Sequence, residues 1–489
     1  MTRPVWFLWL ILVVLPTLTG CGSRLHSAEP AQLAPAPRVV GVPPANAGAG
    51  LIRVSDTEIR HYNLNRRQNR GLDGDQPFGY TVSHDNGQTW STDITPAPEA
   101  IADARHLSQD PRTGAYYALA EGGKWIAKAE SLEGPWQVTP IAYFEDNWGI
   151  IHDIVYPERT DRLVFAVHDV TNGTYTMVSD DDGATWARSN FVTTPPHEKG
   201  GVHEGVRWNH NAAESKMVQL RDGRLWMIIR CAQDHHFEAF SDDNGTTWSE
   251  SRPSRFHGTI TMSHIRRLDD GRLVMVWNST TPLPELARAT GWPEDVFTNR
   301  EALHIAVSND DGQTWRGFRE VYLDPRRNAR DWAETGGSDR GTQQNQFIDL
   351  RDNTVLVALG QHGLHRKFVI VDLDWVTATG RTSSLHDDNG DGAPDDWSTH
   401  QYLPEIRGHC SYNRKPGAQL EPHPDDPARQ VLRIARPTDP ELLCENQGAV
   451  WNFPAAHAGE LHMSIMLPEG SQGAQINLLD HWYNPTDLS

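Results

Sequence analysis

The chain has 489 residues, of which 64 are acidic and 44 basic, giving a formal net charge of −20 without any dense Lys/Arg run. This balance excludes a broad electrostatic surface for nucleic acid, so an anionic ligand would need a local cationic pocket. The 18 Trp, 40 Gly and 32 Pro, with 38% hydrophobic residues, are typical of a turn-rich all-β protein and exclude a helical bundle or a disordered chain.

The first twenty residues have the features of an export signal. Arg3 precedes the apolar stretch VWFLWLILVV, and small residues lead to Cys21. Residues 1–20 are therefore predicted to be a signal peptide. The ending LTGC resembles the bacterial lipobox, which implies that Cys21 is lipidated and anchors the chain to a membrane. Gly22 then favours the outer membrane or cell surface over the inner membrane.

Residues 21–50, rich in Pro, Ala and Gly, are predicted to be a tether.

An eight-residue motif occurs four times in the middle of the chain. It reads SHDNGQTW from Ser83, SDDDGATW from Ser179, SDDNGTTW from Ser241 and SNDDGQTW from Ser308, and a shorter copy, SLEGPW, starts at Ser131. In such a motif Asp and Asn side chains cap the backbone N–H groups of a hairpin turn, Gly permits a positive φ, and Trp anchors the following strand. We therefore expect the aspartates of this motif to be structural.

The spacing of the motif predicts the architecture. Its five copies start 48 to 67 residues apart, with apolar runs such as 224–229 and 272–277 between them. A repeat of this length fits one four-stranded antiparallel blade per copy. The runs 354–359 and 368–375 supply one more blade. The sequence thus predicts an all-β, six-bladed β-propeller over residues 51–380.

The segment 385–398 has an acidic pattern unrelated to the repeat. Oxygen-bearing side chains recur along it with Gly392 at the bend, as a hard cation requires. Because position 12 is Ser398 rather than Glu, the loop resembles the short repeat-type calcium loops of secreted bacterial proteins. We expect a structural Ca²⁺, and no catalytic cofactor. The predicted ligands are Asp387, Asn389, Asp391 and Asp395.

Residues 399–489 carry short β-like runs such as 431–435 and 461–467. They predict a small β-sandwich-like module after the propeller. Cys410 and Cys444 both fall in this segment, and the sequence leaves open whether they pair.

The export signal, the four motifs and the six expected blades together resemble the sialidase (neuraminidase) superfamily of β-propellers, over about residues 50–380. The resemblance implies that the chain acts on acidic sugars of glycans and binds the sugar carboxylate with three arginines, whose planar guanidinium groups suit a carboxylate. Glu214, a D-G turn and Arg230 follow one another in the order of the family's essential glutamate and second arginine.

The other family residues match less completely. Arg300 lies eight residues before a motif, where the family has its third arginine. Arg53 is the candidate for the first, with Arg60 as an alternative, although the family's Arg-Ile-Pro is absent. The acid/base aspartate would be Asp73 or Asp75, and the alternative for each is a D-G-D turn between two strands.

The tyrosine nucleophile of the family has no counterpart. Its position falls near Gln344, and no tyrosine occurs between Tyr322 and Tyr402. Histidines are dense instead, and histidine can act as a general base, a proton donor or a metal ligand at neutral pH. His210 and His264 begin expected blades and are candidates for binding substrate. The others in or beside the blades are His152, His168, His235, His236, His362 and His365.

Three functions follow from these residues. The first is an exported glycoside hydrolase resembling exo-α-sialidases, with Glu214 and Asp73 or Asp75 as catalytic residues and an acidic glycan as substrate. The second is a polysaccharide lyase that uses histidine on uronate-containing glycans. The third is a glycan-binding surface lipoprotein without catalytic turnover.

Overall fold

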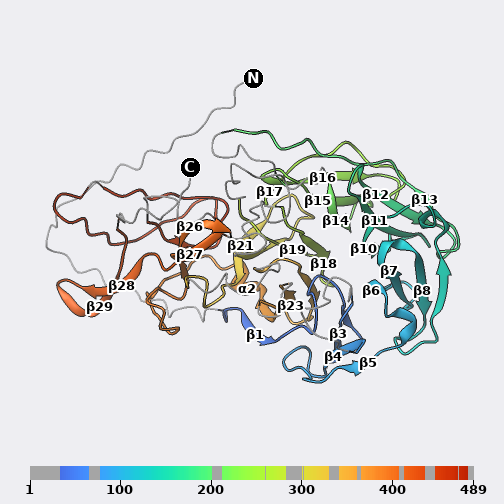
Figure 1. The fold of residues 1–489 in the computed structure, drawn as a ribbon, viewed down its shortest axis with the longest axis horizontal. Helices are drawn as coiled ribbons and strands as arrows, with labels where there is room; N and C mark the ends of the chain where they lie inside the picture. Colours follow the sequence, from blue (N-terminus) through green and yellow to red (C-terminus); the bar gives the residue numbers. More distant parts are fainter. Residues whose placement is uncertain are drawn as a thin grey trace. The chain divides into compact units, whose positions relative to one another are not determined.

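The computed structural model describes residues 34–64, 77–200, 207, 212–258, 260–281, 300, 302–329, 341–360, 365–406, 412–435, 447–471 and 473–482. Their strands form six four-stranded antiparallel sheets, followed by three two-stranded sheets. The six larger sheets are the blades of a β-propeller (Figure 1). This confirms the fold class predicted from the repeat.

The blades follow one another along the chain, and the strands within a blade run mostly in sequence order. Blade one is β2 (Leu51–Arg53), β3 (Ile59–Tyr62), β4 (Gly79–Ser83) and β5 (Thr95–Pro96), and blade two is β6 (Ala104–Gln109), β7 (Tyr116–Ala120), β8 (Trp125–Ala129) and β9 (Gln137–Pro140). Blade three is β10 (Ile150–Val155), β11 (Leu163–Asp169), β12 (Gly173–Ser179) and β13 (Ala187–Arg188), and blade four is β14 (Ala213–Gln219), β15 (Leu225–Arg230), β16 (His235–Ser241) and β17 (Arg252–His257). Blade five is β18 (His264–Arg267), β19 (Leu273–Trp277), β20 (Leu303–Ser308) and β21 (Arg316–Tyr322), and blade six is β22 (Gln346–Asp349), β23 (Thr354–Leu359), β24 (Lys367–Asp372) and β1 (Arg38–Gly41).

The first strand of each blade lies innermost. Each of β2, β6, β10, β14, β18 and β22 contacts the first strand of a neighbouring blade. Hydrogen bonds join β18 to β22 as well, since Arg266 Nη1 donates to the Phe347 carbonyl at 3.3 Å and the Phe347 N–H donates to His264 Nδ1 at 3.3 Å. Residues at the start of these strands are therefore brought together from distant parts of the sequence.

Blade six is closed by a strand from the N-terminal side of the ring. In β1, Arg38 pairs with Ile370 and Val39 with Val369 of β24. The prediction that residues 21–50 are only a tether is thus wrong for Arg38–Gly41, and the propeller begins before residue 51. Four residues among prolines and alanines give too little periodicity to indicate a strand, and only the pairing with β24 reveals it.

The hydrophobic core lies between neighbouring blades. Val274 and Val276 of β19 pack in one cluster with Val355 and Val357 of β23, and all four are fully buried. Each blade is covered on both faces by its neighbours. For this reason its middle strands are continuous apolar runs rather than alternating ones.

The four repeated motifs connect the third and fourth strands of blades one, three, four and five. In the first copy, the Asp85 carboxylate accepts hydrogen bonds from Ser83 Oγ at 2.8 Å, the Thr89 N–H at 2.8 Å and Thr89 Oγ1 at 2.6 Å. The Trp90 indole donates to the Gly87 carbonyl at 3.1 Å, and Gly87 has a φ of 86°. The other three copies repeat the aspartate's hydrogen bonds, so the predicted structural role of these aspartates is confirmed.

Short helical turns connect some of the strands. They are η1 (Glu99–Ile101), η2 (Glu121–Gly123), η3 (Ala142–Phe144) and α2 (Leu373–Val376). Among the residues that the structure describes, no helix has the length and apolar character to cross a membrane.

The C-terminal segment forms small sheets, as the sequence predicted. They pair β25 (Trp397–Ser398) with β30 (Val450–Trp451), β26 (Gln401–Ile406) with β27 (Tyr412–Lys415), and β28 (Gln419–His423) with β29 (Asp426–Arg433). Two isolated bridges connect this segment to the propeller: Gly317 pairs with Ala455, and Thr280 pairs with Trp482.

Candidate functional site

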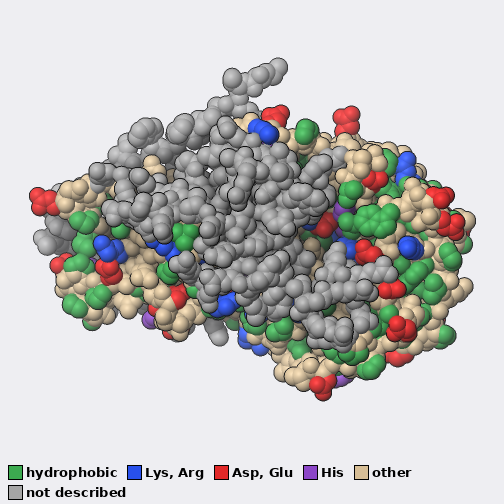
Figure 2. All heavy atoms as spheres, in the orientation of Figure 1, with side chains coloured by type: hydrophobic (Ala, Val, Ile, Leu, Met, Phe, Trp, Pro, Cys, Tyr) green, Lys and Arg blue, Asp and Glu red, His purple; other side chains and the backbone are tan. Residues whose placement is uncertain are grey.

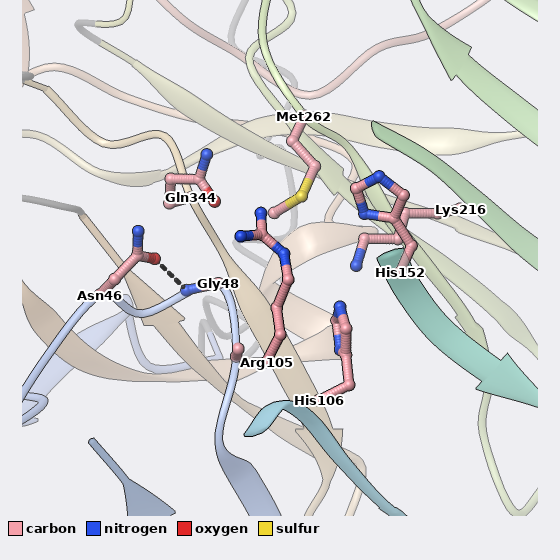
Figure 3. A pocket seen from close by; sticks show the side chains of 9 residues that line it. Asn46, Gly48, Arg105, His106, His152, Lys216, Met262 and Gln344 are labelled. Carbon is pink, nitrogen blue, oxygen red and sulfur yellow. Dashed lines mark hydrogen bonds between the residues drawn. The ribbon is translucent and has the colours of Figure 1, made fainter. Parts of the chain in front are cut away.

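A pocket lies where the first strands of blades two, three and four begin (Figure 3). The guanidinium group of Arg105 projects into it toward Gln344 and Met262. Among the described residues that line the pocket, none carries a carboxylate. The lining residues are Asn46, Gly48, Ala49, Arg105, His106, His152, Lys216, Met262 and Gln344.

The pocket and the repeated motifs are at opposite ends of the blades. Strands one and three of a blade run in the same direction, because each is antiparallel to strand two. The pocket side chains come from the start of first strands, whereas the motifs follow the end of third strands. The aspartates of the motifs are therefore remote from the pocket chemistry.

Each first strand that supplies the pocket is irregular where its polar side chains occur. A β-bulge inserts an extra residue and re-aims side chains, and bulges are frequent beside active sites. In β14 the irregularity includes Glu214, whose φ is 37°, in the left-handed region. The register shifts fall between Ala104 and His106 in β6, between Ile151 and Ile154 in β10, and between Ala213 and Lys216 in β14.

Asp153, on β10, connects four of the six blades. Its carboxylate lies 2.7 Å from His106 Nδ1, 3.0 Å from Lys216 Nζ and 3.3 Å from His264 Nε2. Burial alone raises the pKa of Asp153, but Lys216 and His106 outweigh burial and hold this pKa well below its usual range. Asp153 is thus an ionised hub for residues of blades two, four and five.

The contact with Asp153 determines how His106 can act. An ionised carboxylate only accepts hydrogen bonds, so His106 Nδ1 carries the proton and donates a hydrogen bond to Asp153. Burial lowers the pKa of His106, although Asp153 opposes this shift. His106 is therefore neutral at pH 7, with its lone pair on Nε2, and it lines the pocket. This is the orientation of a general base held by a carboxylate.

A second chain of hydrogen bonds determines the tautomer of His152. The backbone N–H of Glu214 donates to His168 Nδ1 at 3.1 Å, so that nitrogen is unprotonated. His152 Nε2 lies 3.1 Å from the same atom and must be the donor, which leaves the lone pair of His152 on Nδ1. Burial lowers the pKa of His168 to about 4 and that of His152 well below 6.5. Both rings are uncharged at neutral pH.

Glu214 and Arg230 form a buried ion pair beside this chain. Arg230 Nη1 donates to Glu214 Oε2, and the two side chains are 3% and 13% exposed. Burial raises the pKa of Glu214, but Arg230 and His168 lower it to about 2. Glu214 is thus ionised at neutral pH, which suits a base or an electrostatic stabiliser and excludes a proton donor.

Arg105 and Lys216 are the cations that line the pocket. The side chain of Arg105 makes one hydrogen bond in the described part of the protein, from Nη1 to Glu121 Oε2 at 2.9 Å. Its Nε and Nη2 donors remain for a ligand. Lys216 uses one of its three donors on Asp153. Together they can bind an anionic group, although the chain as a whole is acidic. On the face shown in Figure 2, the acidic and basic side chains of the described residues are interspersed.

The family described as BNR repeat-like domain matches residues 68–330, more than half of the chain. The chain belongs to the BNR repeat-like domain family. Membership agrees with the repeated motifs and the six blades, and confirms the BNR-repeat propeller that the sequence predicted.

Solved structures with a similar fold come from several organisms. A protein of unknown function from Dyadobacter fermentans has 17% identity and a TM-score of 0.45, covering 69% of this chain and 98% of its own. The NanB sialidase from Streptococcus pneumoniae has 13% identity and a TM-score of 0.43, covering 70% and 71%. The leech intramolecular trans-sialidase has 11% identity and a TM-score of 0.43, covering 71% and 72%. A search of curated protein sequences finds no match.

In this BNR repeat-like protein, some of the predicted site residues meet and others do not. Glu214 and Arg230 form an ion pair with each other, although neither is among the described residues that line the pocket, and His264 contacts Asp153. Gln344, near which the sequence places the missing tyrosine, lines the pocket.

Two of the predicted arginines are placed elsewhere. Arg300 is buried and donates to the Ile260 carbonyl at 3.3 Å, and it does not line the pocket. Arg53 ends β2 at the opposite end of blade one, where it donates to Asn86 of the first motif and to the Asp349 carbonyl. Arg60, the alternative, pairs with Glu58 and Glu133. Neither Arg53 nor Arg60 contacts Arg230 in the described part. Asp73, Asp75, His210 and Cys21 lie outside the described residues.

The predicted calcium loop is held by its own hydrogen bonds. The Asp387 carboxylate accepts from the N–H groups of Gly390, Asp391 and Gly392 at 2.7 to 3.1 Å. The Asp395 carboxylate accepts from the Asp388 N–H and from Asn389 Nδ2. Among the described residues, the carboxylates of this loop do not gather as a ligand group. Calcium binding here stays a prediction.

Three titratable residues that line the pocket, Arg105, His106 and Lys216, were missed from the sequence, as was Asp153, which contacts two of them. The available signal was a polar or charged pair at the start of an otherwise apolar strand, as in Arg105-His106 and His152-Asp153. Such pairs are common at strand ends, and only the meeting of the first strands distinguishes these from the others.

Proposed function

We propose that this protein is a glycoside hydrolase that removes acidic sugars from glycans in the pocket between the first strands. The observation that carries the proposal is the lining of the pocket. Arg105 and Lys216 provide donors for a carboxylate, and none of the described residues that line the pocket is acidic. Charge-assisted bonds from a guanidinium group to a carboxylate are strong and directional, so they can orient the sugar ring. The BNR-repeat propeller supports a sialidase-like, glycan-active protein.

The residues around the pocket supply a route that needs no tyrosine. His106 Nε2 takes a proton from water, the water oxygen bonds to the anomeric carbon, and the glycosidic bond breaks. Asp153 stabilises the imidazolium that forms, and the ionised Glu214 stabilises positive charge in the transition state. The leaving oxygen takes its proton from an acid, predicted from sequence to be Asp73 or Asp75.

A second candidate is a polysaccharide lyase, which the neutral His106 and His152 favour. In this reaction the cation pair neutralises a uronate carboxylate, and a histidine removes the proton on the adjacent carbon. The bond from the next carbon to the glycosidic oxygen then breaks and leaves a double bond in the sugar, and the leaving oxygen takes a proton back from the histidinium. No water is consumed.

The two reactions are separated by their products on a panel of sialylated and uronate-containing glycans. Free acidic sugar without ultraviolet absorbance supports the hydrolase, and an unsaturated, absorbing product supports the lyase. Replacing Arg105 with Ala should lower kcat/KM by about 10- to 100-fold, since a hydrogen bond to a charged group contributes about 1.5–3 kcal/mol.

The matched control is Arg224→Ala. Arg224 is an exposed arginine at the motif end of blade four, paired with Asp222, and its loss should leave kcat/KM unchanged. Binding of acidic glycans without product in every case contradicts both enzymatic candidates and supports a binding protein. An equal loss of activity in both arginine variants contradicts the assignment of the pocket.

A further inference from the structure

Three potential metal ligands meet away from the pocket. Within the described residues, one group of histidine and carboxylate side chains brings its ligand atoms within 4.8 Å of one another: His257, Asp480 and His481. His257 is the last residue of β17, in blade four, whereas the other two lie more than 200 residues later, in the C-terminal segment 473–482. The group thus joins two parts of the chain that share no sheet.

The distances in this cluster are those of ligands on one small ion. His257 Nε2 lies 3.2 Å from the Asp480 carboxylate, and His481 Nδ1 lies 2.8 Å from it. Two ligands at about 2.0–2.1 Å from a tetrahedral zinc ion are separated by roughly 3.3 Å. The third pair, the nitrogens of the two imidazoles, lies within 4.8 Å, so small side-chain movements can bring all three ligands onto one cation. The same distances also permit direct hydrogen bonds, so the contacts are compatible with both states.

The backbone on both sides of the cluster is held in place. The His257 carbonyl accepts from the Trp277 indole at 2.8 Å. Next to His481, Trp482 is 2% exposed, and its N–H donates to the Ser279 carbonyl at 2.8 Å. Both histidines are thus positioned by neighbouring structure, which lowers the cost of organising a metal site.

The chemistry and exposure of the ligands indicate the kind of ion. Two imidazoles and one carboxylate form a donor set suited to Zn²⁺ and related transition ions rather than to Ca²⁺ or Mg²⁺. The Asp480 side chain is 79% exposed, so solvent can reach the cluster and supply a fourth ligand. A buried structural zinc site would instead use four protein ligands.

We propose that His257, Asp480 and His481 bind one Zn²⁺ ion, and that this ion fastens the C-terminal segment 473–482 to blade four. The site is independent of the pocket and of the glycan chemistry. On the neighbouring strand β16, the ring centroid of His235 lies 4.1 Å from that of His257. Removal of the ion would therefore loosen the segment from blade four.

The test uses the full chain without a polyhistidine tag, stripped with a chelator and titrated with Zn²⁺ in a calorimeter. We expect one ion per chain, with binding weakened at least about tenfold by His257→Gln and by His481→Gln, because each substitution removes a ligand. His462→Gln is the matched control, since His462 is an exposed histidine eleven residues before the segment 473–482, paired with Glu460. It should bind Zn²⁺ like the wild type.

Limited proteolysis provides a second measurement that does not depend on affinity. Zn²⁺ should slow cleavage within residues 473–482 in the wild type and in His462→Gln, but not in His481→Gln. Absence of binding, or binding that His257→Gln and His481→Gln leave unchanged, overturns the proposal and identifies the cluster as an ion pair only. Circular dichroism of each variant separates loss of the metal from loss of the fold.

Discussion

His106 is the pocket side chain whose chemical state is most tightly determined. Asp153 accepts a hydrogen bond from its protonated Nδ1, and the lone pair on Nε2 faces the pocket. We predict that His106→Gln lowers kcat on an acidic glycan by about 10²- to 10⁴-fold, the usual contribution of a positioned general base. Because burial lowers the pKa of His106, the acid limb of the wild-type pH–rate profile should lie below pH 6.5.

His84→Gln is the control for this prediction, since His84 is an exposed histidine in the first motif, at the other end of the blades. Its rate and pH profile should match those of the wild type. An acid limb that persists unchanged in the residual activity of His106→Gln would contradict the role of His106 as the base.

At the same scale, the sequence placed Glu214 and Arg230 on either side of one turn, but it predicted neither their ion pair nor the meeting of residues from different blades. Glu214 and Arg230 face each other because they lie on adjacent strands of one hairpin, in which Ala213 pairs with Arg230. Arg105 lines the pocket, and Asp153 contacts His106, only because blades two and three pack against each other. The sequence could not show that Arg53 lies at the motif end of blade one, because this depends on the direction in which β2 runs in the ring.

The turn motif is the element that repeats most faithfully, and its aspartate can be tested in isolation. In the third copy, Asp243 accepts from Ser241 Oγ, the Thr247 N–H and Thr247 Oγ1 at 2.7 to 2.8 Å. Asp243→Ala leaves these donors without their acceptor, so the free energy of unfolding should fall by about 1–3 kcal/mol. Activity on glycans should not change, because the motif is remote from the pocket.

Urea denaturation followed by tryptophan fluorescence measures the first effect. Asp242→Ala is the matched control, since Asp242 is the adjacent exposed residue of the same motif. It should change stability by less than about 0.5 kcal/mol. Loss of activity in Asp243→Ala at unchanged stability would contradict the structural assignment.

Strand β1 makes a different prediction, because it closes the ring. Val39 pairs with Val369 of β24, and a proline at position 39 removes one backbone donor and strains the pairing. Val39→Pro should increase hydrogen exchange at the β24 amides that face β1, by about tenfold or more. Val42→Pro, one residue beyond the strand, should leave exchange unchanged. Equal exchange in both variants would show that closure does not depend on β1.

For the whole molecule, the blade count followed from the sequence because each blade has its own turn motif or apolar strand pair. The closing strand and the pocket did not, since both arise from contacts between distant segments. Asp153 shows the difference well: it is one carboxylate that binds side chains from three other blades, and no local pattern indicates it. The sequence predicted β-structure in the C-terminal segment, but it did not predict which strands pair there.

The buried histidines give the whole molecule a defined response to acid. Burial lowers the pKa of His236 and of His264 to about 4, and that of His61 and of His304 to about 3. In the unfolded chain these rings have a pKa of about 6.5. As the pH falls below 6.5 the unfolded state binds more protons than the folded state, so stability decreases toward pH 4.

The buried carboxylate of Glu214 acts in the same direction at lower pH, because its pKa is lowered to about 2. Glu320 acts in the opposite direction. Burial raises its pKa to about 7, so it favours the folded state as the pH falls from 7 toward 4.5. One such group cannot offset several histidines, each of which can contribute up to roughly 3 kcal/mol.

We therefore predict that the melting temperature is highest near or above pH 7 and falls continuously between pH 6.5 and 4, measured by calorimetry in one buffer series. His236→Gln should reduce the slope of stability against pH in this window, because it removes one titrating ring away from the pocket. His84→Gln, which changes an exposed histidine, should leave the slope as it is. A stability maximum near pH 5 would show that the buried rings accept protons without cost, contrary to the effect of their burial.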